Sequence, residues 1–187
     1  MPSYLLYKPY GVLSQFTDST KKKRTLKDVY PFPPHVYPIG RLDENSEGLL
    51  ILSDEKGQNQ RILGGKVEKE YWVQVEGIPN QEAIQALREG VRITVRKKPY
   101  HTQPATVQPI LQDPILPERN PPIRFRKQIP TSWLSIVLKE GKNRQVRKMT
   151  AKVGYPTLRL VRWRIGSYTL QHMQVGEVVR HNKPLTF

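Results

Sequence analysis

The sequence has 187 residues, with 31 Lys or Arg against 16 Asp or Glu, so its formal net charge is +15 at pH 7. It contains no Cys, which excludes disulfides and Cys-ligated metals, and no apolar run approaches the ~20 residues of a membrane-spanning helix. A surface this basic attracts polyanions, most often the phosphate backbone of a nucleic acid.

The first forty residues predict short extended segments. Residues 4–8 have the pattern of a strand that Pro9 ends, and residues 12–16 continue in extended form. The basic run at 21–24 predicts a loop that is either simply solvated or in contact with RNA. Four Pro residues keep 31–38 irregular or extended, because Pro lacks an amide donor.

A buried strand and a helix are predicted next. Residues 49–52 form a compact apolar run that is typical of a buried strand. Ser53 or Asp54 is a plausible N-cap for a helix that ends near 64–65, where two Gly residues stand. Alternation of apolar and polar residues over 71–75 predicts a further strand.

The middle of the chain has a well-marked helix and a long loop. The helix begins after Asn80 and ends at Gly90, and residues 91–95 then alternate as a half-exposed strand does. Five Pro residues in 112–130 predict a long loop or a linker between lobes. Residues 133–138 form the next predicted strand.

The C-terminal part concentrates positive charge. From 139 to 164 there are nine basic residues and a single acid, Glu140. A helix capped by Asn143 and ending at Gly154 carries basic residues at 144, 147, 148 and 152, which lie on one face. Such a face predicts a grip on RNA phosphates. Residues 158–165 then alternate as a strand, with Arg159, Arg162 and Arg164 on its polar side and a slip near Val161.

Strands outnumber helices and do not alternate with them regularly. This pattern favours an α+β fold with a largely antiparallel mixed sheet over a doubly wound parallel sheet. The N-terminus lacks the long apolar core of a signal peptide, so we expect a cytoplasmic protein.

The densest group of candidate functional residues lies in 40–52. Arg41, Asp43, Glu44 and Glu47 occupy a predicted loop that leads into the buried strand, and glycines stand at both ends of the loop. From the residues alone, this segment is equally compatible with an ordinary polar turn, a glycosidase carboxylate pair or a divalent-ion site.

Four ordered motifs resemble the bacterial ribosomal RNA pseudouridine synthases of the small-subunit synthase A branch. They are GRLDENSEGLL at 40–50, YKPYGVLS at 7–14, KEYWV at 69–73 and EGKNRQVRKM at 140–149, and LVRWRIG follows at 160–166. Segments 15–18, 75–79, 120–124 and 129–134 are similar to the large-subunit type E synthases, which modify one uridine of 23S ribosomal RNA. Many members carry an accessory RNA-binding domain before the KPxG motif; because this motif starts at residue 8, we expect a protein without that domain, as in type E.

The resemblance implies a single catalytic domain over 1–187, with the pseudouridine synthase fold in two lobes and an active-site cleft between them. It implies that Asp43 is the catalytic carboxylate, that Tyr71 supports the flipped uracil, and that Arg147 is the counter-charge of Asp43. Core packing for Tyr71 and a phosphate contact for Arg147 are the alternatives. The expected RNA-binding residues are Arg41, Lys142, Asn143, Arg144, Lys148, Lys152 and Arg162.

Arg41 is implied to fill the space that the flipped base leaves, and a salt bridge to Glu44 or Glu47 is the alternative. The reaction adds no atom and involves no redox step, so we expect no metal and no cofactor. Separately, we expect a monomer. Two rival interpretations stay open at this point. One is a non-catalytic RNA-binding or ribosome-assembly protein, and the other is a nuclease or glycosidase that uses the carboxylates of 43–47.

Overall fold

A computed structural model describes residues 2–55, 57–123, 128–182 and 185–187. The chain forms two compact units: unit 1 contains Met1–Val67 and Val161–Phe187, and unit 2 contains Glu68–Leu160. Strand β9 (Thr157–Ile165) passes from unit 2 into unit 1 at Val161. Over the described part of the chain, no helix is long and apolar enough to cross a membrane.

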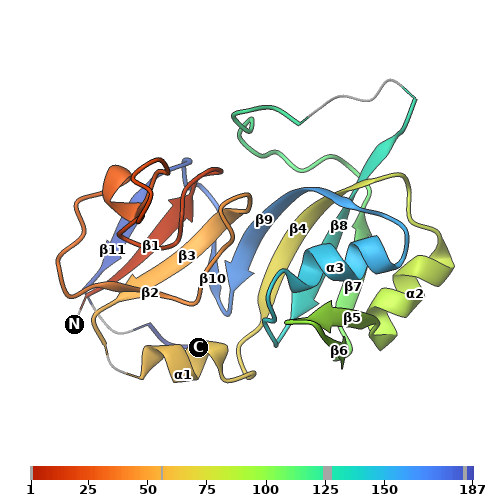
Figure 1. The fold of residues 1–187 in the computed structure, drawn as a ribbon, viewed down its shortest axis with the longest axis horizontal. Helices are drawn as coiled ribbons and strands as arrows, with labels where there is room; N and C mark the ends of the chain where they lie inside the picture. Colours follow the sequence, from red (N-terminus) through yellow and green to blue (C-terminus); the bar gives the residue numbers. More distant parts are fainter. Residues whose placement is uncertain (1, 56, 124–127, 183–184) are drawn as a thin grey trace. The chain divides into compact units, whose positions relative to one another are not determined.

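Unit 1 is built on a sheet in the order β11-β1-β3-β9, with β2 beside β3 and β10 beside β9 (Figure 1). Strand β1 runs antiparallel to both β11 and β3, whereas β3 is parallel to β9. The elements are β1 (Ser3–Lys8), a 3-10 turn (Leu26–Asp28), β2 (Tyr37–Ile39), β3 (Glu47–Ser53), α1 (Gln58–Leu63), β10 (Tyr168–Thr169) and β11 (Val178–His181).

Strands β1 and β3 are buried along their whole length, which explains why their sequences are almost continuously apolar rather than alternating. One side of the pair packs on Leu26 and on a cluster of rings, in which Tyr4 lies edge-on to Phe32 with 5.6 Å between ring centroids. This packing holds the N-terminal segment against the sheet.

Unit 2 consists of β9, β4, β8 and β7 in that order, a β5–β6 hairpin and two helices. Strand β8 is antiparallel to both β4 and β7. The elements are β4 (Lys69–Glu76), α2 (Gln81–Glu89), β5 (Arg92–Val95), β6 (Lys98–His101), β7 (Thr106–Ile110), β8 (Thr131–Leu138) and α3 (Gln145–Lys152). The predicted α+β class with a largely antiparallel sheet is confirmed.

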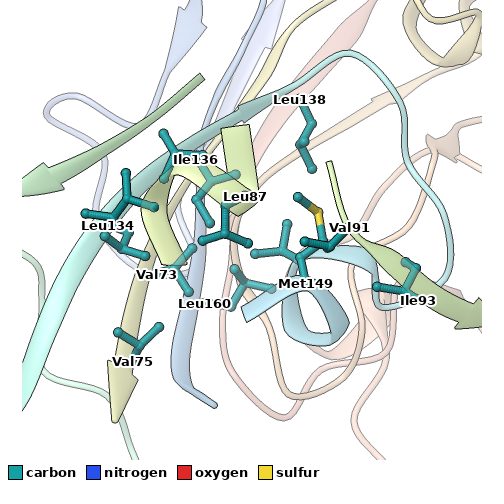
Figure 2. Packing of buried hydrophobic residues seen from close by; sticks show 13 residues of the cluster. Val73, Val75, Leu87, Val91, Ile93, Leu134, Ile136, Leu138, Met149 and Leu160 are labelled. Carbon is teal, nitrogen blue, oxygen red and sulfur yellow. The ribbon is translucent and has the colours of Figure 1, made fainter. Parts of the chain in front are cut away.

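The core of unit 2 lies between the sheet and the elements that cover it. Figure 2 shows Val73 and Leu134 of the sheet together with Leu87 of α2, Ile93 of β5 and Met149 of α3. The covering helices are amphipathic, so burying their apolar faces fixes α3 and its polar face on unit 2.

One of the three predicted N-caps is confirmed. The Asn80 side chain accepts a hydrogen bond of 2.9 Å from the amide of Ala83 at the start of α2. The prediction of Ser53 or Asp54 is wrong, because Ser53 still belongs to β3 and α1 begins after Gly57. The prediction of Asn143 is also wrong: Arg144 is the N-cap of α3, with φ of 51°.

The Pro-rich segment lies within unit 2, between β7 and β8, so of the two alternatives left by the sequence the long loop is confirmed and the linker between lobes is wrong. Residues 124–127 of this loop, including part of the segment compared at 120–124, lie outside the described residues. The extended segment predicted at 12–16 reduces to one isolated bridge, from Val12 to Arg24. Strands β6, β7, β10 and β11 were not predicted, since each is short and lacks a clear alternation.

Alternation is also an incomplete guide to β9. Its polar side was predicted to carry Arg159 and Arg162, yet both side chains are buried. Arg159 Nη2 donates to the Pro117 carbonyl at 2.8 Å, and Arg162 Nε donates to the Leu49 carbonyl at 2.8 Å. A guanidinium can be buried in a strand where main-chain carbonyls accept its protons.

Gly48 of β3 lies directly against the backbone of Arg162 in β9. Its φ is +117°, and a Cβ added there would lie 2.5 Å from both the amide nitrogen and the carbonyl oxygen of Arg162. Backbone atoms of a paired strand cannot move aside, so only glycine fits.

We therefore expect Gly48→Ala to reduce the free energy of unfolding by about 3 kcal/mol, because backbone strain and overpacking add. The matched control is Gly57→Ala, which also has a positive φ of +96° but meets nothing within 4 Å. Backbone strain alone should cost the control about 1 kcal/mol. Urea denaturation of both variants is the measurement, and equal losses would contradict the steric argument.

Candidate active site

Asp43 lies on the loop that joins β2 to β3 in unit 1. Its side chain is half-buried, and Leu42 and Ser46 close to it are buried. The Ser46 amide donates to the Asp43 carbonyl at 3.0 Å and closes a tight turn. The carboxylate therefore stands on a loop whose course is fixed immediately before the buried strand.

The register of β1 and β3 places this loop beside the segment that follows β1. Lys8, the last residue of β1, is opposite Gly48, so residues 9–14 and 41–46 leave the same end of the antiparallel pair. The Gly11 amide donates to the Glu44 carbonyl at 2.8 Å. The Ser14 hydroxyl accepts from the Leu42 amide at 3.0 Å and donates to the Leu42 carbonyl at 2.8 Å.

Lys8 is completely buried at the base of this arrangement. Its Nζ donates to the carbonyls of Pro9 at 2.8 Å and Val12 at 2.7 Å. Burial lowers the pKa of Lys8 from 10.5 to about 7; the positive charge of Arg162 acts in the same direction, and the Glu47 carboxylate opposes both. Lys8 thus holds the turn after β1 in place.

The basic run at 21–24 is an exposed loop organised by Asp18. The Asp18 carboxylate accepts from the amides of Lys22 and Lys23 and from the Thr20 hydroxyl, and the Thr20 bond is the main cause of its pKa falling to about 2. Lys23 Nζ lies 2.6 Å from Glu44 Oε2, so this loop is joined to the Asp43 loop.

Arg41 is exposed at the start of the Asp43 loop. Glu44 takes Lys23 as its ion-pair partner, and across the described residues Arg41 forms neither of the salt bridges, to Glu44 or Glu47, that the sequence left open. Its guanidinium is therefore presented to solvent beside Asp43 in the chain.

In unit 2, Tyr71 lies on β4 opposite Ile136 of β8. It is half-buried and packs against the core cluster, on the same side of the strand as Val73. The core packing left open as an alternative thus accounts for part of the ring, while the remainder is accessible.

A buried carboxylate organises the loop before α3. Glu140 accepts hydrogen bonds from the Tyr100 hydroxyl, from the Gln103 amide at 2.8 Å and from Gln145 Nε2 at 2.5 Å. Gln145 Oε1 in turn accepts from the Lys142 amide at 2.9 Å. Donation to the Glu140 carboxylate raises the pKa of Tyr100 to about 12.

This arrangement leaves Lys142, Asn143 and Arg144 exposed at the start of α3. Along the helix, Val146 and Met149 point into the core, and Arg147 and Lys148 are half-buried. Arg144, Lys148 and Lys152 recur every four residues and form one face, which we call the basic face. The basic face belongs to a helix that is fixed at both its apolar side and its N-terminal loop.

The predicted site residues are thus divided between the units. Asp43, Arg41 and Arg162 belong to unit 1, and the remaining ones, Tyr71, Lys142, Asn143, Arg144, Arg147, Lys148 and Lys152, belong to unit 2. The structure brings Arg144, Lys148 and Lys152 together. It buries Arg162, which weighs against the predicted RNA contact for that residue.

Several residues around the predicted site were not assigned a role from the sequence. Lys8 and Ser14 lie within the KPxG-type motif, and Glu140 and Gln145 lie within the segment at 140–149, so the motifs contained the signal. Tyr100 stands in no motif. Among the residues that the structure describes, no group of three His, Asp or Glu is placed to hold a metal ion.

Comparison with known proteins adds a family to this geometry. A model of the RNA pseudouridylate synthase family matches residues 3–152. The ribosomal large subunit pseudouridine synthase E of Vibrio vulnificus is 51% identical over 172 residues, which cover 91% of this chain and 70% of that protein. The protein of the same name from Xanthomonas campestris is 50% identical over 176 residues, with 92% and 91% covered. A crystal structure of a pseudouridylate synthase matches with a TM-score of 0.75 and 25% identity, covering 97% of this chain and 71% of that one.

The lowered pKa of Lys8 predicts a pH-dependent stability. Between pH 7 and 10.5 the unfolded chain keeps the Lys8 proton while the folded protein releases it, so the unfolded state binds more protons and stability rises with pH. Relative to Lys8→Met, the wild-type free energy of unfolding should rise by about 1.4 kcal/mol per pH unit in this window. Chemical denaturation of both proteins at several pH values is the measurement. A difference that stays constant with pH would show that Lys8 remains charged in the fold.

Proposed function

The chain belongs to the RNA pseudouridylate synthase family, an enzyme family that isomerises uridine to pseudouridine, and we propose that it modifies a uridine of 23S ribosomal RNA with Asp43 as the catalytic carboxylate. The names of two relatives that share about half of its residues support the large ribosomal subunit as the source of the substrate. The motifs at 7–14 and 40–50 support a place in the small-subunit synthase A branch.

The fixed loop around Asp43 is the observation that carries the catalytic assignment. A protein that only grips RNA has no need for a carboxylate on a clamped loop, because the carboxylate repels phosphate. Catalysis, in contrast, needs a reactive group held in one geometry by its surroundings. The half-buried Asp43 and the hydrogen bonds to the backbone around it meet this requirement.

The chemistry requires a carboxylate and little else. The N1–C1′ bond of the nucleotide breaks, the uracil turns, and C5 is joined to C1′. The proton on C5 is then lost and N1, which has left C1′, takes up a proton, so the product is an isomer of the substrate. A carboxylate can attack the sugar, attack the base or remove a proton from C2′. Each route needs Asp43 ionised, and a neighbouring cation favours the ionised form. Arg147 is that cation in our proposal, on the strength of its position in the motif at 140–149.

We propose that Tyr71 and Arg41 act when the target uridine is flipped out of its helix. A uridine inside a helix must leave its stack before an enzyme can act on it. The accessible part of the Tyr71 ring offers a surface for the flipped uracil, and the exposed Arg41 guanidinium is suited to fill the space that the base leaves. Both assignments rest on the motifs together with the exposure of these side chains.

The basic face and the exposed loop before it supply the grip on RNA. Lys142, Asn143 and Arg144 are exposed, whereas Glu140, the single acid among residues 139–164, is buried. Phosphate contacts of this kind position the RNA without reading its sequence.

We propose that the protein acts as a monomer and without a metal ion.

Asp43→Asn should abolish isomerisation and leave RNA affinity within about twofold, since one charge of a +15 protein contributes little to phosphate binding. Glu44→Gln is the matched control, a neighbouring carboxylate that forms an exposed ion pair, and it should keep its rate within a few-fold. Pseudouridine in 23S ribosomal RNA fragments is measured after incubation in chelator. An active Asp43→Asn protein would refute the assignment, and a wild-type protein that binds but never isomerises would point to a binding module.

The basic face and Arg147 should respond differently to substitution. Replacing Arg144, Lys148 and Lys152 by Ala should flatten the slope of log affinity against log salt by about two, at roughly 0.7–0.9 for each phosphate that is no longer neutralised. The rate of the saturated complex should change little. Arg147→Ala should instead cause a large loss of rate with a small change in slope. The measurements are RNA affinity at several salt concentrations and the single-turnover rate of each variant. If Arg147→Ala flattens the salt slope and keeps its rate, as expected for the triple variant, then Arg147 is a phosphate contact.

A further inference from the structure

Ser14 makes an unusual pair of contacts with the Asp43 loop. Its single hydroxyl accepts a hydrogen bond from the Leu42 amide and donates one to the Leu42 carbonyl, at 3.0 and 2.8 Å. Ser14 is 6% exposed and lies 28 residues before Leu42 in the chain. A hydroxyl can fill both roles because it is at once a donor and an acceptor.

The two bonds constrain Asp43 rather than only Leu42. The carbonyl of Leu42 belongs to the planar peptide unit that also contains the amide nitrogen and Cα of Asp43. Fixing that carbonyl therefore fixes the position of the Asp43 Cα, from which the side chain extends. On the other side of Asp43, its own carbonyl accepts from the Ser46 amide at 3.0 Å. The two peptide planes that meet at the Asp43 Cα are both held.

The segment that carries Ser14 is itself held firmly. The Val12 carbonyl accepts from buried Lys8, and the Leu13 amide donates to the Arg24 carbonyl at 2.9 Å. After Ser14, the Gln15 carbonyl accepts from the Leu26 amide at 3.0 Å. Ser14 is thus anchored on both sides, and its hydroxyl can position the loop instead of following it.

We infer that Ser14 is a positioning residue of the isomerisation, acting through the Leu42–Asp43 peptide to hold the Asp43 carboxylate where it reacts. This inference rests on the proposed catalytic role of Asp43. Ser14 itself touches the loop backbone and takes no part in bond making or proton transfer. A displacement of about 1 Å at a reacting group can reduce a rate by about 100-fold, which sets the scale of the effect.

The test compares Ser14→Ala with Ser3→Ala in the full-length protein. Ser3 is the matched control: it is a buried serine of unit 1 whose hydroxyl donates to Ser53, at the opposite end of β1. Ser14→Ala should lower the single-turnover rate on saturating protein by about 10- to 100-fold, with the RNA dissociation constant within about twofold. Ser3→Ala should keep both quantities within about twofold. A folded Ser14→Ala protein with the wild-type rate overturns the inference, as does a rate loss equal to that of Ser3→Ala.

A second variant covers the case in which Ser14→Ala does not fold. Ser14→Cys keeps a similar side chain but has only a weak donor and acceptor, so it should bind RNA normally and react at least about fivefold more slowly than the wild type. A wild-type rate for Ser14→Cys also overturns the inference. Asp43→Asn distinguishes a failure of the Ser14 inference from a failure of the catalytic assignment of Asp43. If Asp43→Asn is inactive while Ser14→Ala is fully active, only the role of Ser14 is refuted. If Asp43→Asn is active, the proposed catalytic role of Asp43 is itself refuted.

Discussion

The antiparallel register of β1 and β3 is the constraint on which the Asp43 loop depends. Because Lys8 is opposite Gly48, the chain that leaves β1 and the chain that enters β3 run side by side. Hydrogen bonds between these two segments can then form at short range, although their residues are about thirty positions apart in sequence. Ordering a loop costs conformational entropy of about 1–2 kcal/mol per residue, so a catalytic loop needs such partners to keep one conformation.

Both units use a buried polar side chain to organise a loop next to predicted site residues. In unit 1, Lys8 donates to the carbonyls of the turn that leads to Ser14. In unit 2, Glu140 accepts from Tyr100, from the Gln103 amide and from Gln145, and the loop before α3 takes its shape from these bonds. A buried charge is costly to desolvate, and its hydrogen bonds select one arrangement of the surrounding chain more than they add stability. In each case the buried group lies within a motif shared with the family, next to the residues assigned to catalysis or RNA binding.

Three acids that lie in or near the predicted site have defined structural roles. Glu44 is paired with Lys23, Asp18 is used to fold the loop of the basic run, and Glu140 is enclosed. These carboxylates are occupied by structural partners. Exposed Lys and Arg side chains on loops and on the basic face contribute to the net charge of +15, which is suited to a polyanionic substrate.

The sequence by itself determined the features that depend on neighbouring residues. The apolar run at 49–52 predicted β3, Asn80 and Gly90 marked the ends of α2, and the ordered motifs identified the family before any geometry was known. Only the tertiary structure decided features that arise between distant segments. Arg159 and Arg162 are buried where carbonyls from other parts of the chain accept their protons, and β7 and β11 are strands because they pair with β8 and β1. Ser14 gains its role because strand pairing brings its hydroxyl to Leu42. Local patterns record the period and polarity of a segment, whereas the partner of a buried polar group is set by which segments meet, and that is a property of the whole fold.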